Sequence, residues 1–227
     1  MLSTLIDYFT TLAVLEWAAM LLSVAYIILA AKGSLWCWPA AFISTTLYTY
    51  IFYDVLLLMD SALNAYYLIM ALYGYWAWKN QTDNVATQKN NSQSSHIIAS
   101  NFSVVSWQAS LHITACFILA LISLMWGFYM ANFTSADFPY LDTFTTVYAI
   151  FATYLVTQKV LENWLYWIVI DLVSIYLYVE KGLYPTVLLF IIFVAIAFYG
   201  YYKWRSLINN SADNNNEDTS TTGSSFA

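Results

Sequence analysis

Seven apolar stretches alternate with polar connections along this chain. They cover roughly residues 13–31, 35–53, 56–78, 108–130, 139–157, 162–179 and 184–204. Each is close to the length of about 20 residues that an α-helix needs to cross the hydrocarbon layer of a bilayer. The pattern therefore predicts an all-α membrane protein with seven transmembrane helices.

Two polar segments divide these helices into groups. Residues 80–106 are rich in Asn, Gln and Ser and predict a polar loop, whereas residues 206–227 predict a disordered tail that faces the cytoplasm. The predicted organisation is a first three-helix repeat (12–79), the polar loop (80–106), a linker helix (107–131), a second three-helix repeat (139–205) and the tail (206–227).

The two three-helix units repeat one another at a constant offset of 126 residues. Trp38 matches Trp164, and the segment Tyr73-Gly74-Tyr75-x-x-Trp78 returns as Tyr199-Gly200-Tyr201-x-x-Trp204. Because one helix separates two units of three, both units enter the membrane in the same direction. This parallel 3+1+3 arrangement is that of the SWEET sugar carriers, and internal repeats of this kind are typical of transporters.

Composition supports a protein surrounded by lipid. The 227 residues are 61% hydrophobic and only 9% charged, whereas soluble domains carry about 25% charged residues. There is no basic patch for nucleic acid. The sequence contains no Ser/His/Asp grouping, no phosphate-binding loop and no paired metal ligands, so we expect neither an enzyme nor a resident metal or cofactor.

The basic residues predict the orientation in the membrane. If the seven helices are right, one side carries Lys32, Lys79, Lys89, Lys159, Lys203 and Arg205, and the other side carries Lys181 alone. Basic residues are enriched in cytoplasmic connections. We therefore expect a multi-pass protein of the cell (inner) membrane, with the amino terminus outside and the carboxyl terminus in the cytoplasm.

The stretch 162–179 carries the candidate chemistry. Trp164, Trp167 and Asp171 are spaced i, i+3 and i+7, which places two indoles and a carboxylate on one helical face. Indole faces and an anion suit a cationic aromatic ring. An ionisable residue near mid-membrane is costly unless it faces a cavity or a partner. The alternative for Trp164 is an interfacial anchor near the start of its helix.

Other polar or aromatic residues complete the candidate site. Asn64 lies deep in the third stretch, where an interhelical hydrogen bond is the alternative interpretation. The second stretch offers Trp38 and Tyr48, the fifth offers Thr146, and Asn163 precedes Trp164. His112 stands alone in the fourth stretch, where a packing role is favoured.

The stretch Glu162-Asn163-Trp164-Leu165-Tyr166-Trp167 closely resembles the sixth-helix motif of the PnuC family of vitamin carriers. The seven stretches, the Tyr-Gly-Tyr segments and Lys-Gly-Leu-Tyr at 181–184 fit the same family over about residues 12–205, without the polar loop. The resemblance implies a SWEET-like fold, a homotrimer, and uptake of a vitamin by facilitated diffusion with trapping by phosphorylation. It also implies that Trp164 and Trp167 contact the substrate.

The vitamin stays open at this point. Nicotinamide riboside and thiamine both carry a cationic ring and stand at close to even odds. Some nicotinamide riboside carriers have a neutral amide at the position of Asp171 and Gln at the position of Asn64. These differences favour thiamine as the substrate. The alternatives are a proton-coupled carrier of another vitamin such as riboflavin, or a membrane protein that does not transport.

Overall fold

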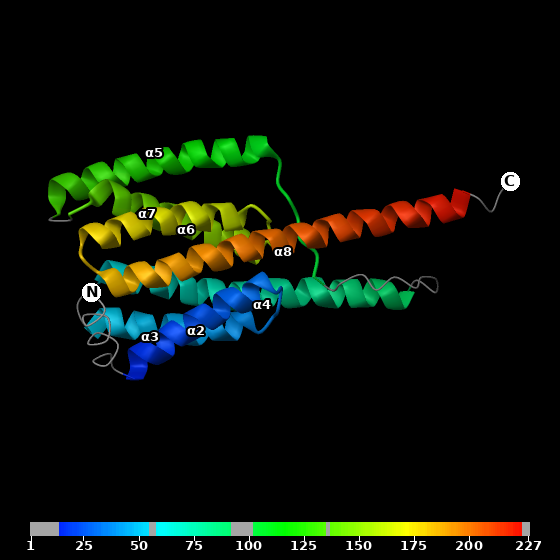
Figure 1. Cartoon of the computed structure of the whole chain (residues 1–227), viewed down its shortest axis with the longest axis horizontal. Helices are drawn as coiled ribbons and strands as arrows, with labels where there is room; N and C mark the ends of the chain where they lie inside the picture. The colour runs from blue at the N-terminus through cyan, green and yellow to red at the C-terminus, as the bar shows by residue number, and fades with distance from the viewer. Residues whose placement is uncertain (1–13, 55–57, 92–101, 135–136, 224–227) are drawn as a thin grey trace.

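The computed structural model describes residues 14–54, 58–91, 102–134 and 137–223, and this part of the chain is helical throughout its long elements (Figure 1). The helices are α2 (Val14–Ala31), α3 (Cys37–Asp54), α4 (Leu58–Asn91), α5 (Ala109–Phe133), α6 (Pro139–Thr157), α7 (Asn163–Glu180) and α8 (Tyr184–Gly223). Each begins within two residues of an apolar stretch identified in the sequence. The all-α prediction is therefore confirmed.

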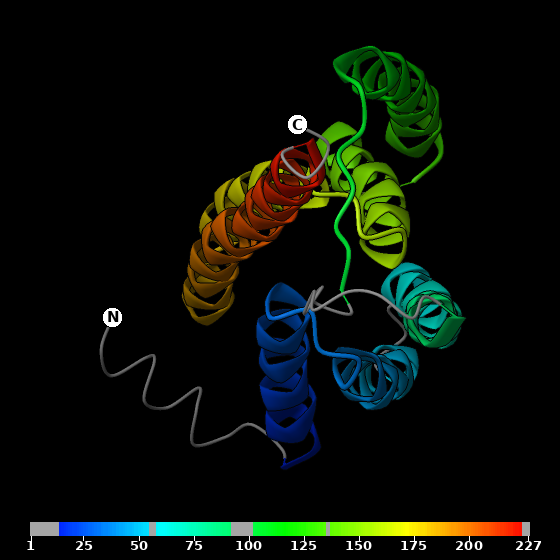
Figure 2. The ribbon, with the colours of Figure 1, turned by 90° about the vertical axis from the view of Figure 1, so that its right-hand side faces the viewer.

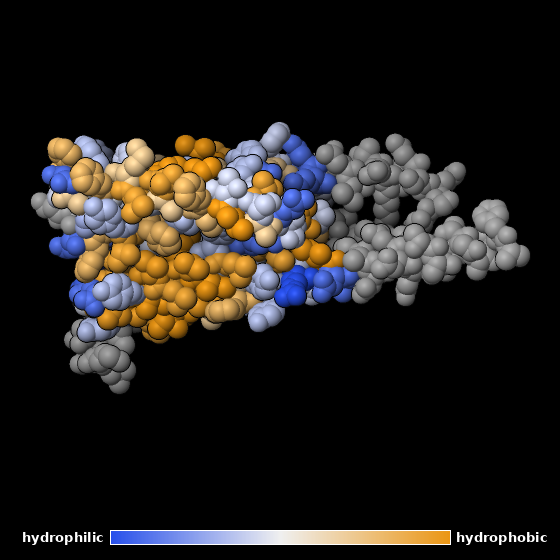
Figure 3. Space-filling model, turned by 90° about the horizontal axis from the view of Figure 1, so that it is seen from above, coloured by the Kyte–Doolittle hydropathy of each residue, from blue (hydrophilic) through white to orange (hydrophobic). Residues whose placement is uncertain are grey.

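The face of the molecule in Figure 3 has an apolar belt between two more polar ends. Within the described residues, three helical segments are long and apolar enough to cross a membrane by length and composition alone, namely Val14–Ala31, Ala109–Phe133 and Thr186–Asn210. Helix α3 carries more hydroxyl groups, and these return to its own backbone: Thr45 donates to the Ala41 carbonyl at 2.8 Å and Thr46 to the Phe42 carbonyl at 2.7 Å. Such bonds satisfy polar groups in lipid.

Six helices form a closed ring (Figure 2). Around the ring the order is α2, α3, α4, α6, α7 and α8, and each helix contacts its two neighbours. Helix α5 packs on the outside of α6. Helices α2–α4 therefore meet helices α6–α8 at two interfaces, α2 with α8 and α4 with α6. The third helix of each unit packs against the first helix of the other.

The core shows the same contacts twice, 126 residues apart. The indole N–H of Trp78 donates to the Val156 carbonyl and that of Trp204 to the Ala30 carbonyl, both at 3.2 Å. Each of these indoles packs edge-on against a second tryptophan. The ring centroids of Trp38 and Trp78 are 5.2 Å apart and those of Trp164 and Trp204 are 5.3 Å apart, with 86° between the planes in both pairs. Equivalent tryptophans thus bind each half to the other half.

The connections after α2, α6 and α7 share a left-handed residue. Gly33, Lys159 and Gly182 have φ angles of 69°, 55° and 69°. In each case the following amide donates to the carbonyl five residues before it, as Ser34 does to Leu29 and Val160 to Leu155, both at 3.0 Å. This hydrogen-bond pattern ends a helix and favours glycine at the left-handed position. Lys159 is thus a non-glycine residue where the first half has Gly33.

Two helices extend past the predicted boundaries. Helix α4 continues to Asn91 instead of ending near residue 79, and α8 continues to Gly223 instead of ending near Arg205. Both extensions are polar, but neither contains a glycine or proline before its last residue that would stop a helix. The predicted loop is therefore shorter at its start, while residues 92–101 lie outside the described part.

We expect alanine at Gly74 or Gly200 to destabilise the protein strongly. A Cβ atom at Gly74 would lie 2.2 Å from the buried Trp38 ring, and one at Gly200 would lie 2.7 Å from the Trp164 ring. Overpacking a core costs about 1–3 kcal/mol and occasionally more, so both variants should melt at lower temperature in detergent. Gly182→Asn is the control, because nothing lies within 4 Å of that position and Asn tolerates its backbone conformation. An unchanged melting temperature for both alanine variants would contradict the tight tryptophan–glycine packing.

Candidate functional site

Asp171 is a buried acid in the middle of α7. Its side chain is 4% exposed. Within the part of the chain that the structure describes, it accepts no hydrogen bond and forms no ion pair. A buried carboxylate without a partner is costly. Asp171 is therefore the residue of this helix that most requires an external partner.

Electrostatic interactions across the ring place Asp171 toward its interior. Tyr67 of α4 lies within electrostatic range of Asp171, and Tyr26 of α2 lies within range of Tyr67. Neither α4 and α7 nor α2 and α4 are neighbours in the ring. Residues that approach one another from helices that are not neighbours must do so inside the ring. Tyr26, Tyr67 and Asp171 therefore converge on the centre of the bundle.

Trp167 lies one helical turn before Asp171 and is half-buried. It packs against both apolar clusters of the core, the larger one around Trp38, Trp164 and Trp204 and the smaller one around Tyr148 and Ile170. A partly exposed indole between two rigid clusters is held in place while part of its ring stays accessible. This is the geometry needed for an aromatic surface beside an acid.

Trp164 and its counterpart Trp38 lie deeper, with 3% and 2% of their surfaces exposed. Their contacts with Trp204, Gly200, Trp78 and Gly74 are those of core residues. Both indole N–H groups are buried, and no described residue accepts a hydrogen bond from either. The two residues thus combine a packing role with an unused donor in each half.

The remaining predicted site residues lie as follows. Asn64 is half-buried on α4, one turn before Tyr67. The Asn163 amide nitrogen donates to the Val160 carbonyl at 2.5 Å, while its buried oxygen has no partner among the described residues. The Thr146 hydroxyl donates to the Asp142 carbonyl at 2.8 Å, and the half-buried Tyr48 ring stacks on Phe52 at 5.6 Å. Of this group, the structure brings Asn64 nearest to the face that carries Tyr67.

The candidate site is asymmetric although the fold repeats. At the offset of 126, Ala41 and Thr45 stand in α3 where α7 has Trp167 and Asp171. Conversely, Ala152 and Phe193 stand in the second half where the first half has Tyr26 and Tyr67. The second half therefore supplies the acid and the indole, and the first half supplies the phenols. A ligand in this centre meets two different surfaces.

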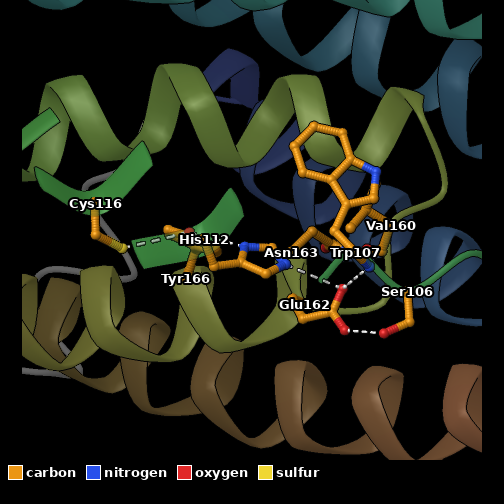
Figure 4. A network of polar contacts seen from close by, with 8 residues as sticks. All are labelled: Ser106, Trp107, His112, Cys116, Val160, Glu162, Asn163 and Tyr166. Carbon is orange, nitrogen blue, oxygen red and sulfur yellow. Dashed lines mark hydrogen bonds and ion pairs between the residues drawn. The ribbon is translucent and has the colours of Figure 1, made fainter. Parts of the chain in front are cut away.

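Sequence reasoning missed a polar network at the start of α7 (Figure 4). The Glu162 carboxylate accepts hydrogen bonds from the Ser106 hydroxyl at 2.5 Å and from the Trp107 amide at 3.2 Å, and its Oε2 lies 3.4 Å from His112 Nε2. The other ring nitrogen of His112 lies 3.1 Å from the Tyr166 hydroxyl. His112 is thus not a lone packing residue. The network joins α5 and the segment before it to the helix that carries Asp171.

Among the described residues, no group of three or more His, Cys, Asp or Glu side chains is placed to hold a metal ion. The Asp171 centre, formed by Asp171, Trp167, Tyr26 and Tyr67, contains one carboxylate, one indole and two phenols. Such a set can hold an organic cation by charge, stacking and hydrogen bonds. Binding of such a ligand is the chemistry that these groups support.

Comparison with known proteins gives a consistent result. The family model for nicotinamide mononucleotide transporters matches residues 13–206. The nicotinamide riboside transporter PnuC of Escherichia coli is 25% identical over 178 residues, which are 71% of this chain and 72% of that protein. PnuC of Haemophilus influenzae is 26% identical over 201 residues, or 86% of this chain and 82% of that protein. The riboflavin/roseoflavin transporter RibM of Streptomyces davaonensis is 26% identical over 191 residues, or 83% and 84%.

The fold also matches a solved structure. The crystal structure of the vitamin B3 transporter PnuC superposes with a TM-score of 0.70 at 18% identity, over 92% of this chain and 88% of that one. At this identity the superposition shows the fold, and the family follows from the match over residues 13–206. This chain is a multi-pass membrane protein that belongs to the nicotinamide mononucleotide transporter family, as its resemblance to PnuC predicts.

Proposed function

We propose that this protein takes up a vitamin with a cationic aromatic ring and binds it between Trp167 and Asp171 in the centre of the ring of helices. The observation that carries the proposal is the buried carboxylate of Asp171, which has no partner among the described residues and lies one turn after a half-buried indole. A cationic ligand would supply the missing countercharge. Tyr67, Asn64 and Tyr26 would contact the uncharged part of the ligand from the opposite half.

Nicotinamide riboside is the first candidate and thiamine the second. The similarity to two nicotinamide riboside transporters favours the riboside, and the thiazolium ring of thiamine offers the same charge to Asp171. Riboflavin is the alternative suggested by the similarity to RibM, but its neutral ring leaves the carboxylate without a countercharge. The remaining predicted residues, Trp164, Trp38, Asn163, Tyr48 and Thr146, would line or support the pathway.

We propose a parallel 3+1+3 architecture with α5 as the linker helix. Its support is that the starts of α3 and α7, the starts of α4 and α8, and the core contacts repeat at one offset, including the two tryptophan hydrogen bonds between the halves. Transport would occur as the halves rock about the α2–α8 and α4–α6 interfaces. Facilitated diffusion with trapping by phosphorylation needs no coupling ion, and a homotrimer in the inner membrane is the expected assembly.

Labelled uptake into proteoliposomes tests this function. Vesicles that contain the protein should accumulate nicotinamide riboside or thiamine only to equilibrium without an ion gradient, and faster than empty vesicles. A kinase and ATP inside the vesicles should raise total uptake by converting the substrate. Saturable uptake of riboflavin with neither cation transported would overturn the cationic-ring assignment. Uptake that requires a proton gradient would overturn facilitated diffusion.

The proposed orientation places the carboxyl terminus in the cytoplasm. Lys32 and Lys159 lie just after the ends of α2 and α6, and Lys79 and Lys203 lie at the ends of the apolar parts of α4 and α8. These four positions share one end of the bundle (Figure 1). A reporter that is active only in the cytoplasm should therefore work when fused after Arg205. The same reporter joined after Glu180, in the connection before α8, should be inactive. The reverse pattern would show that the protein inserts the other way.

A further inference from the structure

The segment before α5 crosses the lysine-rich end of the ring (Figure 2). Its backbone is tied to the second half, because the Val105 amide donates to the Lys159 carbonyl at 3.1 Å and the Leu161 amide donates to the Val105 carbonyl at 2.8 Å. The Phe102 ring lies edge-on to Trp78 at 4.8 Å and to Trp204 at 5.4 Å between centroids. Phe102 therefore lies between the two halves at this end.

Lys159 is buried beneath this segment with 1% of its surface exposed. Its ammonium nitrogen lies 4.5 Å from the centroid of Phe102 and 5.3 Å from that of Trp78. Aromatic faces attract a cation but do not neutralise it. No carboxylate in the described part of the chain forms an ion pair with Lys159. The cation is thus enclosed without a counterion.

The fold does not require a side chain at this position. The equivalent residue in the first half is Gly33, which ends α2 with the same left-handed backbone and the same hydrogen bonds. A lysine with positive φ is less favourable than glycine there. Strained, buried polar residues of this kind are concentrated at functional sites. The side chain, rather than the backbone, is what distinguishes the second half.

A cavity of about 260 Å³ lies against Lys159. It is lined by Gly33, Leu35, Trp78, Thr82, Phe102 and Lys159. The Thr82 hydroxyl, which donates to the Trp78 carbonyl at 3.0 Å, still has lone pairs and can rotate to donate to a ligand instead. We propose that this cavity is an anion-binding site, separate from the Asp171 centre, that takes the phosphate group of a small phosphate monoester.

The charge state of Lys159 gives the site a defined pH dependence. Burial lowers the pKa of Lys159 from 10.5 to about 8, and Cys37 of α3 is the titratable group beside it. A bound anion favours the ammonium form. Because the second pKa of a phosphate monoester is about 6, the charge of ribose 5-phosphate is nearly constant above pH 7.5, and it is the ligand for this measurement. Binding should therefore be strong below pH 8 and should fall about tenfold from pH 7 to pH 9 as the lysine loses its proton.

Calorimetric titration of the purified protein tests the site. In a maltoside detergent, which carries no phosphate, ribose 5-phosphate and inorganic phosphate should bind saturably. Lys159→Gly should weaken binding at least tenfold without lowering the melting temperature, because glycine suits the backbone there. Lys159→Arg should retain binding. Lys32→Met is the control, since Lys32 is an exposed lysine at the same end, and it should bind like the parent.

A second titration identifies the source of the phosphate group. Added phosphatidic acid, a lipid whose headgroup is a phosphate monoester, would compete with ribose 5-phosphate if a lipid headgroup reaches the cavity, and it would have no effect if the site serves soluble metabolites only. Both results support an anion site at Lys159. Absence of saturable phosphate binding in the parent at pH 7, or binding by Lys159→Gly within twofold of the parent, would overturn the proposal. Neither readout depends on which vitamin is transported.

Discussion

Replacing Asp171 with asparagine should weaken binding of a cationic vitamin at least tenfold at pH 8. The substitution keeps the shape of the side chain and removes its charge. Asp171 is buried with no partner among the described residues, so the ligand would supply the only countercharge. Breaking a buried charge pair costs about 3–5 kcal/mol, and about 1.4 kcal/mol already corresponds to tenfold in affinity.

The pH dependence separates charge pairing from simple hydrogen bonding. In the parent, affinity for the cation should rise as the pH is raised from 5 to 8, because the carboxylate form becomes more populated. The asparagine variant should show no such rise, so the difference between the two proteins grows with pH. Titration of nicotinamide riboside and thiamine over this range measures both curves, and the ligand that shows the larger difference is the better match to Asp171.

Asp142→Asn is the matched control for this experiment. Asp142 lies in the first turn of α6, and its carboxylate is 3.8 Å from the Lys181 ammonium with 41% of the side chain exposed. Exposed ion pairs contribute about 0–1 kcal/mol, so this variant should bind like the parent. Equal affinity of Asp171→Asn and the parent for both vitamins at every pH would remove Asp171 from the binding site.

The repeat explains why the helices could be predicted from the sequence. Helices α3 and α7 begin at Cys37 and Asn163 and end at Asp54 and Glu180, so both bounds agree at the offset of 126. The lengths of the apolar stretches and the matching Trp and Tyr-Gly-Tyr positions predict these helices without knowledge of any long-range contact. The depth of Asp171 follows from the same count of residues along α7.

The contacts across the ring could not be predicted in this way. Lys159 has the sequence signature of a cytoplasmic lysine, and only folding places Phe102, far along the chain, over its ammonium group. Likewise His112 and Glu162 are 50 residues apart and meet because α5 packs beside the start of α7. The offset of 126 aligns Lys159 with Gly33. This alignment could have predicted the left-handed backbone of Lys159, since a glycine at a helix end often marks a left-handed residue.

The candidate site stays a prediction, and the sequence indicated only part of its local geometry. The spacing of Trp167 and Asp171 places both on one face of α7, but the same spacing gives Trp164 an equal role. The structure separates the two indoles: Trp164 is enclosed by Trp204 and Gly200, whereas Trp167 is only half-buried. Tyr26 gave no signal in the sequence, because an aromatic residue in an apolar stretch is ordinary and its counterpart is Ala152.

This difference leads to opposite expectations for the two tryptophans. Trp167→Ala should reduce affinity for the cationic vitamin about tenfold or more, because desolvated cation–π contacts contribute about 2 kcal/mol and tenfold corresponds to about 1.4 kcal/mol. It should leave most of the thermal stability intact, since Trp167 is half-buried. Trp164→Ala should instead destabilise the fold by about 3–5 kcal/mol, which is typical of a large aromatic residue removed from a core.

Parallel measurement of binding and melting temperature distinguishes the two effects. Trp38→Ala is the matched control, because Trp38 packs against Gly74 and Trp78 as Trp164 packs against Gly200 and Trp204, yet its helix has Thr45 where α7 has Asp171. If Trp164 only supports the core, Trp38→Ala and Trp164→Ala should lower the melting temperature similarly and affect affinity similarly. If the indole N–H of Trp164 also contacts the ligand, Trp164→Phe should weaken binding more than Trp38→Phe at comparable stability. Parental affinity in Trp167→Ala would assign Trp167 to packing and would move the aromatic surface to another helix.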